Sequence, residues 1–276
     1  MRAHANRELE LPAGIREEEG STRGPAPDVA VLCEAPLANP FEASLLDEPV
    51  SWRATGSLHH KGLAVAGRQG ELRSRGAIEA PGRWGVAVTD QNGLGVLGAW
   101  SVPVPGRRYG DEVLGIIDAH ADWLASGDVV VAGDFNIDAN GVGNGTRGAE
   151  LFATLVERLS ALGLVSAYHS WTREAFGAES RRTHFHLRKA NRGFHIDCCF
   201  VPEAWSGRIR DVVEPKERAS SNRVRIHPAE AGVHNTGGGG HVAPLLLVER
   251  VVSCFTVGGV GSWGYGESCC CGVGVA

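Results

Sequence analysis

The chain has 276 residues, of which 43% are hydrophobic and 21% are charged, a balance typical of globular proteins that excludes wholesale disorder. Its formal net charge of −5 excludes a protein that coats nucleic acid through bulk positive charge. The sequence holds no run of about 18 apolar residues and no apolar signal-peptide core, so we expect a cytoplasmic protein with no membrane partner, and a monomer is favoured. The seven cysteines fit neither a disulfide framework nor a metal-binding spacing, which predicts free thiols.

Residues 1–27 are polar, rich in charge and glycine, and show no apolar period. We expect them to form a poorly ordered leader. From Asp28 the pattern changes, because short and almost wholly apolar runs appear, and such runs predict buried strands. In the first hundred residues these runs cover 29–33, 62–66, 85–88 and 95–100.

Two later segments have the three- and four-residue apolar spacing of amphipathic helices. They cover residues 111–126 and 149–162, and Gly163 follows the second where a helix C-cap is expected. Further strands are predicted from apolar or β-branched runs at 129–132, 164–167, 195–201, 209–213 and 245–248. Strands interleaved with helices indicate an α/β chain.

We expect one domain over residues 28–250. Residues 215–240 are polar and glycine-rich without a clear period. Residues 251–276 carry one charged side chain, Glu267, and no amphipathic pattern. The prediction for this last segment is a Gly- and Cys-rich tail outside the domain.

Polar side chains stand at or beside one end of four predicted strands. Glu34 follows the first strand, Asp134 and Asn136 follow the run at 129–132, Asp197 lies near the start of 195–201, and His241 precedes 245–248. A carboxylate beside a buried strand costs desolvation energy unless it is paired or bound to metal. Any one of these residues alone is well explained as a cap or turn residue. The set together indicates one converged site, since open sheets gather catalytic groups at strand ends.

Four segments, in this order, resemble motifs of the endonuclease/exonuclease/phosphatase superfamily. They are the strand that ends in a glutamate (28–34), the GDFN signature (133–136), the late strand "(R/H)IDY-hydrophobic" (195–202) and an echo of the terminal "Ser-Asp-His-x-Pro-Leu" block (240–245). The resemblance covers about residues 28–250. It implies a four-layer α/β/β/α sandwich of two mixed β-sheets, and Mg²⁺- or Mn²⁺-dependent cleavage of phosphate esters.

The resemblance also implies a role for each matching residue. Glu34 would supply an oxygen ligand to the metal ion. Asp134 would orient and deprotonate the attacking water, and Asn136 would fix either the phosphoryl group or Asp134. His241 would stabilise charge on a phosphate oxygen, while Asp197 would hold the His241 ring and raise its pKa.

A cluster of cations lies just before the late strand. Arg181, Arg182, Arg188 and Lys189 stand among interleaved aromatic residues. They form either a loop that binds substrate phosphates or an ordinary solvated loop, and the sequence leaves both open. Together with the resemblance, the cluster favours DNA or RNA as the phosphate-ester substrate. Isolated histidines such as His169 are expected to be structural.

Departures from the family motifs leave two alternatives open. Gly240 stands where the family has an aspartate, Trp100 and Ser101 stand where a mid-chain histidine is common, and no early strand with a metal-site asparagine is recognisable. One alternative is a catalytically weakened or inactive fold-mate that binds nucleic acid or a protein partner. The other is a damaged or wrongly delimited chain.

Overall fold

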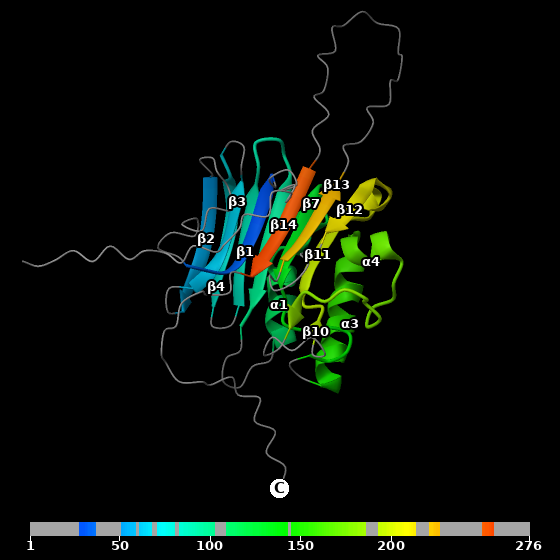
Figure 1. The fold of residues 1–276 in the computed structure, drawn as a ribbon. Coiled ribbons are helices and arrows are strands. Elements are labelled where there is room, and N and C mark those ends of the chain that lie inside the picture. Colours follow the sequence, from blue (N-terminus) through cyan, green and yellow to red (C-terminus); the bar gives the residue numbers. More distant parts are fainter. Residues whose placement is uncertain are drawn as a thin grey trace, which may run out of the picture.

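The computed structural model describes most of the predicted domain (Figure 1). The described residues are 28–36, 51–58, 61–67, 71–80, 83–102, 109–142, 145–185, 193–213, 221–226 and 250–256. The predicted leader (1–27) and the predicted strand at 245–248 lie outside them, as does His241.

The first sheet joins segments from both ends of the domain. Its strand order is β12-β13-β14-β1-β3-β2, and it is mixed, because β1 and β14 pair in parallel whereas the other neighbours pair antiparallel. The strands are β1 (Val29–Pro36), β2 (Ser51–Leu58), β3 (Lys61–Gly67), β12 (Ile209–Val213), β13 (Ser221–Ile226) and β14 (Arg250–Thr256).

The second sheet is also mixed and has the order β4-β5-β6-β7-β11-β8. Only β6 and β7 pair in parallel, and the remaining pairs are antiparallel. The strands are β4 (Arg73–Ala80), β5 (Arg83–Thr89), β6 (Gly95–Ser101), β7 (Val129–Asp134), β8 (Leu164–Ser166) and β11 (Asp197–Pro202). A separate hairpin pairs β9 (His184–Phe185) with β10 (Gly193–Phe194).

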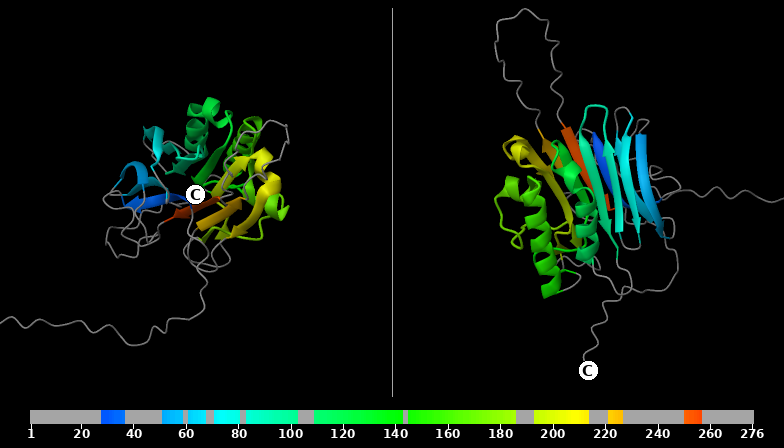
Figure 2. Two further views of the ribbon diagram at one scale, coloured as in Figure 1. Left: turned by 90° about the horizontal axis from the view of Figure 1, so that it is seen from above. Right: turned by 180° about the vertical axis from the view of Figure 1, so that it is seen from behind.

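The described helices are α1 (Tyr109–Ala119), α2 (Ala121–Leu124), α3 (Thr146–Ala161) and α4 (Ala167–Thr172), with a 3-10 helix at Glu203–Arg208. Figure 2 shows α1 and α3 on the face of the second sheet that is turned away from the first. On α3, Phe152, Leu155 and Leu159 follow the helical spacing and are buried against that sheet. The chain leaves α3 through Gly163, whose φ of 77° suits glycine.

The main core lies between the two sheets. Both sheets supply β-branched side chains, and the second sheet adds Trp84 and Trp100. A second core fills the space between the second sheet and its helices. The predicted arrangement of two mixed sheets with helices outside is therefore confirmed. Within the described residues, the helical layer covers the outer face of the second sheet only.

Most predicted elements are present, with shifted bounds. The predicted helix at 111–126 is two helices, α1 and α2, which meet at His120. The ring of His120 lies 3.1 Å from the Ile116 carbonyl oxygen at this break (Nδ1···O). The predicted strand at 195–201 begins two residues later, at Asp197. Cys33, Cys198 and Cys199 are buried thiols that form no disulfide.

The predicted C-terminal boundary at residue 250 is wrong for the first residues of the tail. β14 covers Arg250–Thr256 and lies inside the first sheet, between β1 and β13. Residues 251–256 form an apolar run like those that predict buried strands elsewhere in the chain, but the prediction places them in the tail together with the Gly- and Cys-rich residues that follow them. β13 (Ser221–Ile226) likewise occupies a stretch in which the sequence predicted no element.

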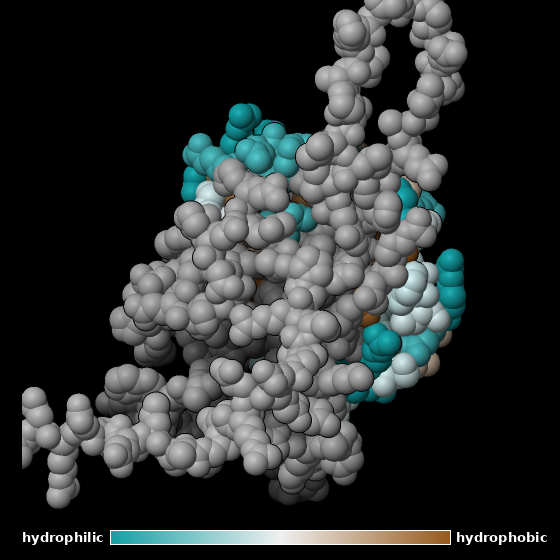
Figure 3. All heavy atoms as spheres, turned by 45° about the horizontal axis from the view of Figure 1, so that its top comes forward, coloured by the Kyte–Doolittle hydropathy of each residue, from teal (hydrophilic) through white to brown (hydrophobic). Residues whose placement is uncertain are grey.

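None of the described helices combines the length and the apolar character needed to cross a membrane. In Figure 3 the coloured residues of the visible face are mostly hydrophilic or neutral, with small brown areas. The large hydrophobic side chains that are exposed in the described part of the chain are Trp171 and Phe176.

Candidate active site

Two aspartates face each other across neighbouring strands of the second sheet. Asp134 ends β7 and Asp197 begins β11, and the two residues are direct partners in the antiparallel register. Ala132 and Cys199, each two residues away along its strand, belong to the core between the sheets. Because strand side chains alternate, both carboxylates also face inward, and both are buried. The chain thus places two predicted site residues at one edge of the sandwich, hereafter the carboxylate edge.

Asn136 holds the Asp134 carboxylate in place. Its backbone N–H donates to Asp134 Oδ1 at 3.0 Å, and its Nδ2 donates to Asp134 Oδ2 at 3.0 Å. The same Nδ2 also donates to the Ser101 carbonyl oxygen at 2.9 Å, which anchors it to β6. Asn136 has a φ of 53°, a conformation that asparagine tolerates better than most residues. Both hydrogens of the amide are therefore used inside the protein.

Glu34 comes to the carboxylate edge from the first sheet. Val29, Val31 and Cys33 of β1 face the core between the sheets, so regular alternation would turn residue 34 outward. The pairing of β1 with β3 is irregular at this point, and Glu34 has a φ of 56°. Such a bulge re-aims a side chain.

Contacts with Asp134 confirm that this end of β1 lies at the carboxylate edge. The backbone N–H of Asp134 donates to Cys33 Sγ at 3.4 Å. The charge of Glu34 also acts on the Asp134 carboxyl. The two sheets therefore meet here, and each contributes acidic residues to one place.

The pKa of Asp134 lies well above its usual range. Burial is the largest cause, and the negative charges of Asp197 and Glu34 raise the pKa further. The hydrogen bonds from Asn136 act in the opposite direction. Asp134 is therefore a carboxyl group with a raised affinity for protons, which suits a group that accepts a proton from water.

Thr183 positions Asp197, a role that no pattern in the sequence indicated. Its Oγ1 accepts the backbone N–H groups of both Ile196 and Asp197 at 3.0 Å. The Thr183 N–H donates to the Phe194 carbonyl oxygen at 2.8 Å, and the residue is buried. In the sequence Thr183 stands inside the basic cluster, and no spacing connects it with a strand that begins 14 residues later.

Replacing Thr183 with valine should destabilise the protein by roughly 1–3 kcal/mol, because two buried N–H groups lose their acceptor. Urea denaturation measures the change. Thr183→Ser keeps the oxygen and should recover most of the loss. Thr154→Val is the matched control, since the Thr154 hydroxyl bonds its own exposed helix. A Thr183→Val protein as stable as the wild type would contradict the proposed anchoring.

The remaining predicted site residues have other partners or lie outside the described residues. His241, Arg188 and Lys189 are not described. The Arg181 Nη1 donates to the Val212 carbonyl oxygen at 2.8 Å, and the Arg182 Nη1 lies 3.3 Å from Glu179 Oε2. Both arginines thus have protein partners, and a role in binding substrate stays a prediction.

The carboxylate edge has donor chemistry that fits a hard divalent cation. Glu34, Asp134 and Asp197 bring oxygen ligands and mutual repulsion, and a cation would relieve that repulsion. Among the described residues, no group of three or more His, Cys, Asp and Glu side chains stands ready to hold a metal ion. Mg²⁺ commonly binds through one or two carboxylates and keeps several waters, so these residues fit it without a complete protein cage.

The known proteins to which this chain is similar are solved structures with a similar fold. No protein-family model matches the sequence, and no curated protein does. Among solved structures, the chain is similar to a 3'-5' exonuclease (NExo) from Neisseria meningitidis, with a TM-score of 0.53 and 22% identity over 67% of this chain and 80% of that one. It is also similar to an AP endonuclease from Archaeoglobus fulgidus, with a TM-score of 0.47 and 16% identity over 67% and 80% of the two chains.

A third solved structure is named for the superfamily whose motifs the sequence resembles. It is an endonuclease/exonuclease/phosphatase from Beutenbergia cavernae, with a TM-score of 0.42 and 16% identity over 75% of this chain and 74% of that one. The likeness to the exonuclease, at 22% identity, shows a shared fold alone, and chemistry has to be argued from the site.

Proposed function

We propose that this chain, which has the fold of the endonuclease/exonuclease/phosphatase superfamily, hydrolyses phosphate esters with the help of a divalent metal ion. One observation carries the proposal: Asp134 and Asp197 are cross-strand partners, with Asn136 bonded to one of them and Glu34 within electrostatic reach. These residues come from strands of two sheets, and the order of their motifs in the sequence matches the family resemblance.

In this proposal Asp134 accepts a proton from the attacking water. Its raised pKa brings its proton affinity closer to that needed for general-base catalysis near neutral pH. Asn136 fixes the two carboxylate oxygens of Asp134. The sequence left open whether Asn136 holds Asp134 or the phosphoryl group, and its two bonds to Asp134 together with the one to Ser101 favour the first role.

Glu34 would hold the metal ion, which we infer to be Mg²⁺ or Mn²⁺. When bound, such an ion neutralises charge that develops on the phosphate. Asp197 would orient the imidazole of His241, a residue that lies outside the described part of the chain. Cytoplasmic location and a monomeric state are retained as predictions from the sequence.

Nucleic acid is the favoured substrate class. In the sequence Arg181 and Arg182 precede β9, and Arg188 and Lys189 stand between β9 and β10. A cluster of positive side chains attracts a phosphate backbone locally even in a chain of net negative charge. The similar structures are titled an exonuclease and an AP endonuclease, which supports this choice.

The test is hydrolysis of DNA, RNA and a generic phosphodiester by purified protein with Mg²⁺, with Mn²⁺ and with a chelator. We expect cleavage that requires the metal. Glu34→Gln should weaken metal binding at least about 10-fold, as measured by calorimetry. Glu150→Gln, which changes an exposed glutamate on α3, is the matched control.

Persistent hydrolysis in the chelator would contradict the metal requirement. Nucleic-acid binding without hydrolysis in either metal would instead support the alternative of an inactive fold-mate. Unchanged activity in His241→Ala would remove His241 from its predicted role.

A further inference from the structure

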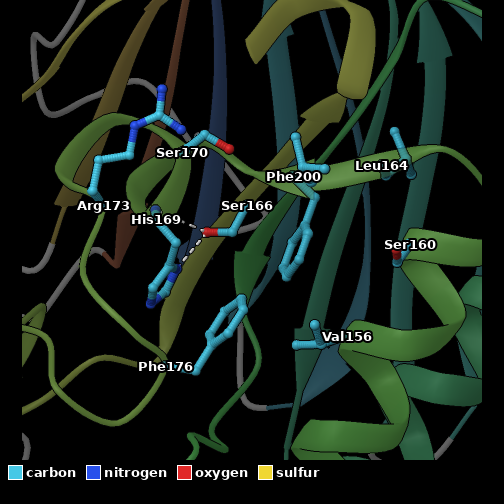
Figure 4. Close-up of a pocket in the computed structure, with 10 residues that line it drawn as sticks. Val156, Ser160, Leu164, Ser166, His169, Ser170, Arg173, Phe176 and Phe200 are labelled. Carbon is cyan, nitrogen blue, oxygen red and sulfur yellow. Dashed lines mark hydrogen bonds between the residues drawn. The ribbon is translucent and has the colours of Figure 1, made fainter.

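A second polar site lies on the outer side of the second sheet, away from the carboxylate edge. It is a pocket of about 320 Å³, within the size range of small-molecule sites. Side chains of α3, β8, α4, the following loop and β11 line it: Val156, Ser160, Leu164, Val165, Ser166, His169, Ser170, Arg173, Phe176 and Phe200 (Figure 4). Phe200 belongs to the core under the helices, so this pocket opens on the face of β11 opposite to Asp197.

Ser166 and His169 form a close hydrogen bond at this pocket. Ser166 ends β8 and is the N-cap of α4. The distance from Ser166 Oγ to His169 Nδ1 is 2.7 Å, whereas the capping bond from the His169 N–H to the same Oγ is long, at 3.5 Å. Figure 4 shows the Ser166 oxygen aimed at the imidazole ring. The main partner of the hydroxyl is thus a potential base.

The carboxylate of a buried glutamate contacts the second nitrogen of the same ring. The distance from His169 Nε2 to Glu179 Oε1 is 3.2 Å, and the Glu179 side chain is 1% exposed. The Gly177 N–H donates to Oε1 at 2.8 Å, and the Arg182 Nη1 lies 3.3 Å from Oε2. The carboxylate is therefore held firmly, and Arg182 balances its charge.

The charge state of Glu179 decides which nitrogen of His169 carries the proton. Burial by itself raises the pKa of Glu179, but the hydrogen bonds, with that from His169 first among them, lower it to about 2. An ionised Glu179 can only accept, so Nε2 carries the hydrogen. Nδ1 then offers its lone pair to the Ser166 hydroxyl. The ring of Phe176 lies against the imidazole, with 3.8 Å between centroids, and limits its rotation.

We propose that Ser166, His169 and Glu179 form a nucleophilic site that hydrolyses small acyl esters in this pocket. His169 Nδ1 takes the hydroxyl proton as Ser166 Oγ bonds to the ester carbonyl carbon. The ester C–O bond then breaks, the alcohol leaves with that proton, and the acyl group stays on Ser166. Water releases the acid through the same base and restores the hydroxyl.

The pocket lining selects the class of ester. Val156, Leu164 and Phe200 supply an apolar wall for a short hydrocarbon or aromatic acyl group. Ser160, Ser170 and Arg173 supply the further hydrogen-bond donors of the lining, and donors of this kind can stabilise negative charge on a carbonyl oxygen. Because the pocket opens on the other face of β11, this activity needs neither the metal ion nor Asp134.

The experiment treats the full chain with an alkyl fluorophosphonate, in a chelator, and maps the adduct by mass spectrometry. We expect one phosphonyl adduct, on Ser166. Hydrolysis of p-nitrophenyl acetate and butyrate, also in the chelator, should fall at least about 100-fold in Ser166→Asn and in His169→Gln. Asparagine is a good N-cap, so Ser166→Asn removes the nucleophile and keeps the helix start. Ser126→Ala, whose hydroxyl bonds the Trp123 carbonyl oxygen outside the pocket, is the control.

No adduct, or an adduct on another serine only, would overturn the proposal. Equal ester hydrolysis in the wild type and Ser166→Asn would overturn it as well. Mapping the adduct on the wild-type protein gives a result even where a variant fails to fold. Loss of the adduct in Ser166→Asn with metal-dependent phosphoester cleavage retained would confirm that the two sites are separate.

Discussion

Replacing Asp134 with asparagine should lower phosphoester hydrolysis by about 100- to 10,000-fold, the usual contribution of a positioned general base. Asparagine has nearly the same shape and can still accept the Asn136 backbone N–H at Oδ1, a bond that is 3.0 Å long in the wild type, but it cannot take a proton from water. Initial rates at saturating metal and substrate measure the effect. Asp122→Asn, a change at an exposed aspartate on α2, should leave the rate unchanged.

The same variant should change how stability depends on pH. Because the pKa of Asp134 is raised in the folded state, the folded protein binds a proton more tightly than the unfolded chain does. The free energy of unfolding of the wild type therefore falls as pH rises from the ordinary aspartate pKa through the raised one. Asparagine does not titrate, so Asp134→Asn should become progressively more stable relative to the wild type over that window.

Thermal unfolding in a chelator at several pH values, from about 4 upward, measures this difference. A difference that stays constant with pH would contradict the raised pKa. Activity within a few-fold of the wild type would remove Asp134 from the role of base, whatever the stability data show.

Replacing Gly133 with alanine should prevent folding or lower the free energy of unfolding by more than about 4 kcal/mol. So large a loss is exceptional for a single substitution. β6 and β7 pair in parallel, and Gly133 lies opposite Ala99. A Cβ on Gly133 would stand 1.7 Å from the Ala99 carbonyl oxygen, and Gly133 has a φ of 157°. The neighbouring backbone cannot give way without breaking the ladder that carries Asp134.

Gly127→Ala separates the two causes. Gly127 has a similar φ of 143°, but a Cβ there would meet no atom within 4 Å. Gly127→Ala should therefore lower the free energy of unfolding only by the backbone strain, about 1–3 kcal/mol. Yield of folded protein, circular dichroism and urea denaturation compare the two variants. Similar stability of both would show that the approach of β6 to Gly133 is not the constraint.

The hydrophobic pattern predicted the buried framework. β1, β7 and α3 were predicted correctly because an apolar run, or apolar residues at helical spacing, can be recognised within a short stretch of sequence. Among the strands that were missed, β2, β4 and β13 have mixed or polar sequences. β2 and β4 are edge strands that pair only with the next strand of the chain, β3 and β5, whereas β13 lies between β12 and β14. Hydrogen bonds to these neighbours stabilise all three strands without a continuous apolar run.

For the carboxylate edge, the sequence determined the residue types and their order: a glutamate after β1, the segment Gly133 to Asn136, and Asp197. It also predicted a sandwich of two mixed sheets with helices, which the structure confirms. Only the tertiary structure decided that Asp134 and Asp197 are cross-strand partners, that a bulge re-aims Glu34, and that Thr183 anchors Asp197. The same holds for His169, which acquires Ser166 and Glu179 as partners. The sequence specifies which side chains are present. Their distances and burial depend on how strands that are far apart in the chain pack together. Because desolvation and charge interactions depend on separation in space, the pKa values of these groups are set by the tertiary structure.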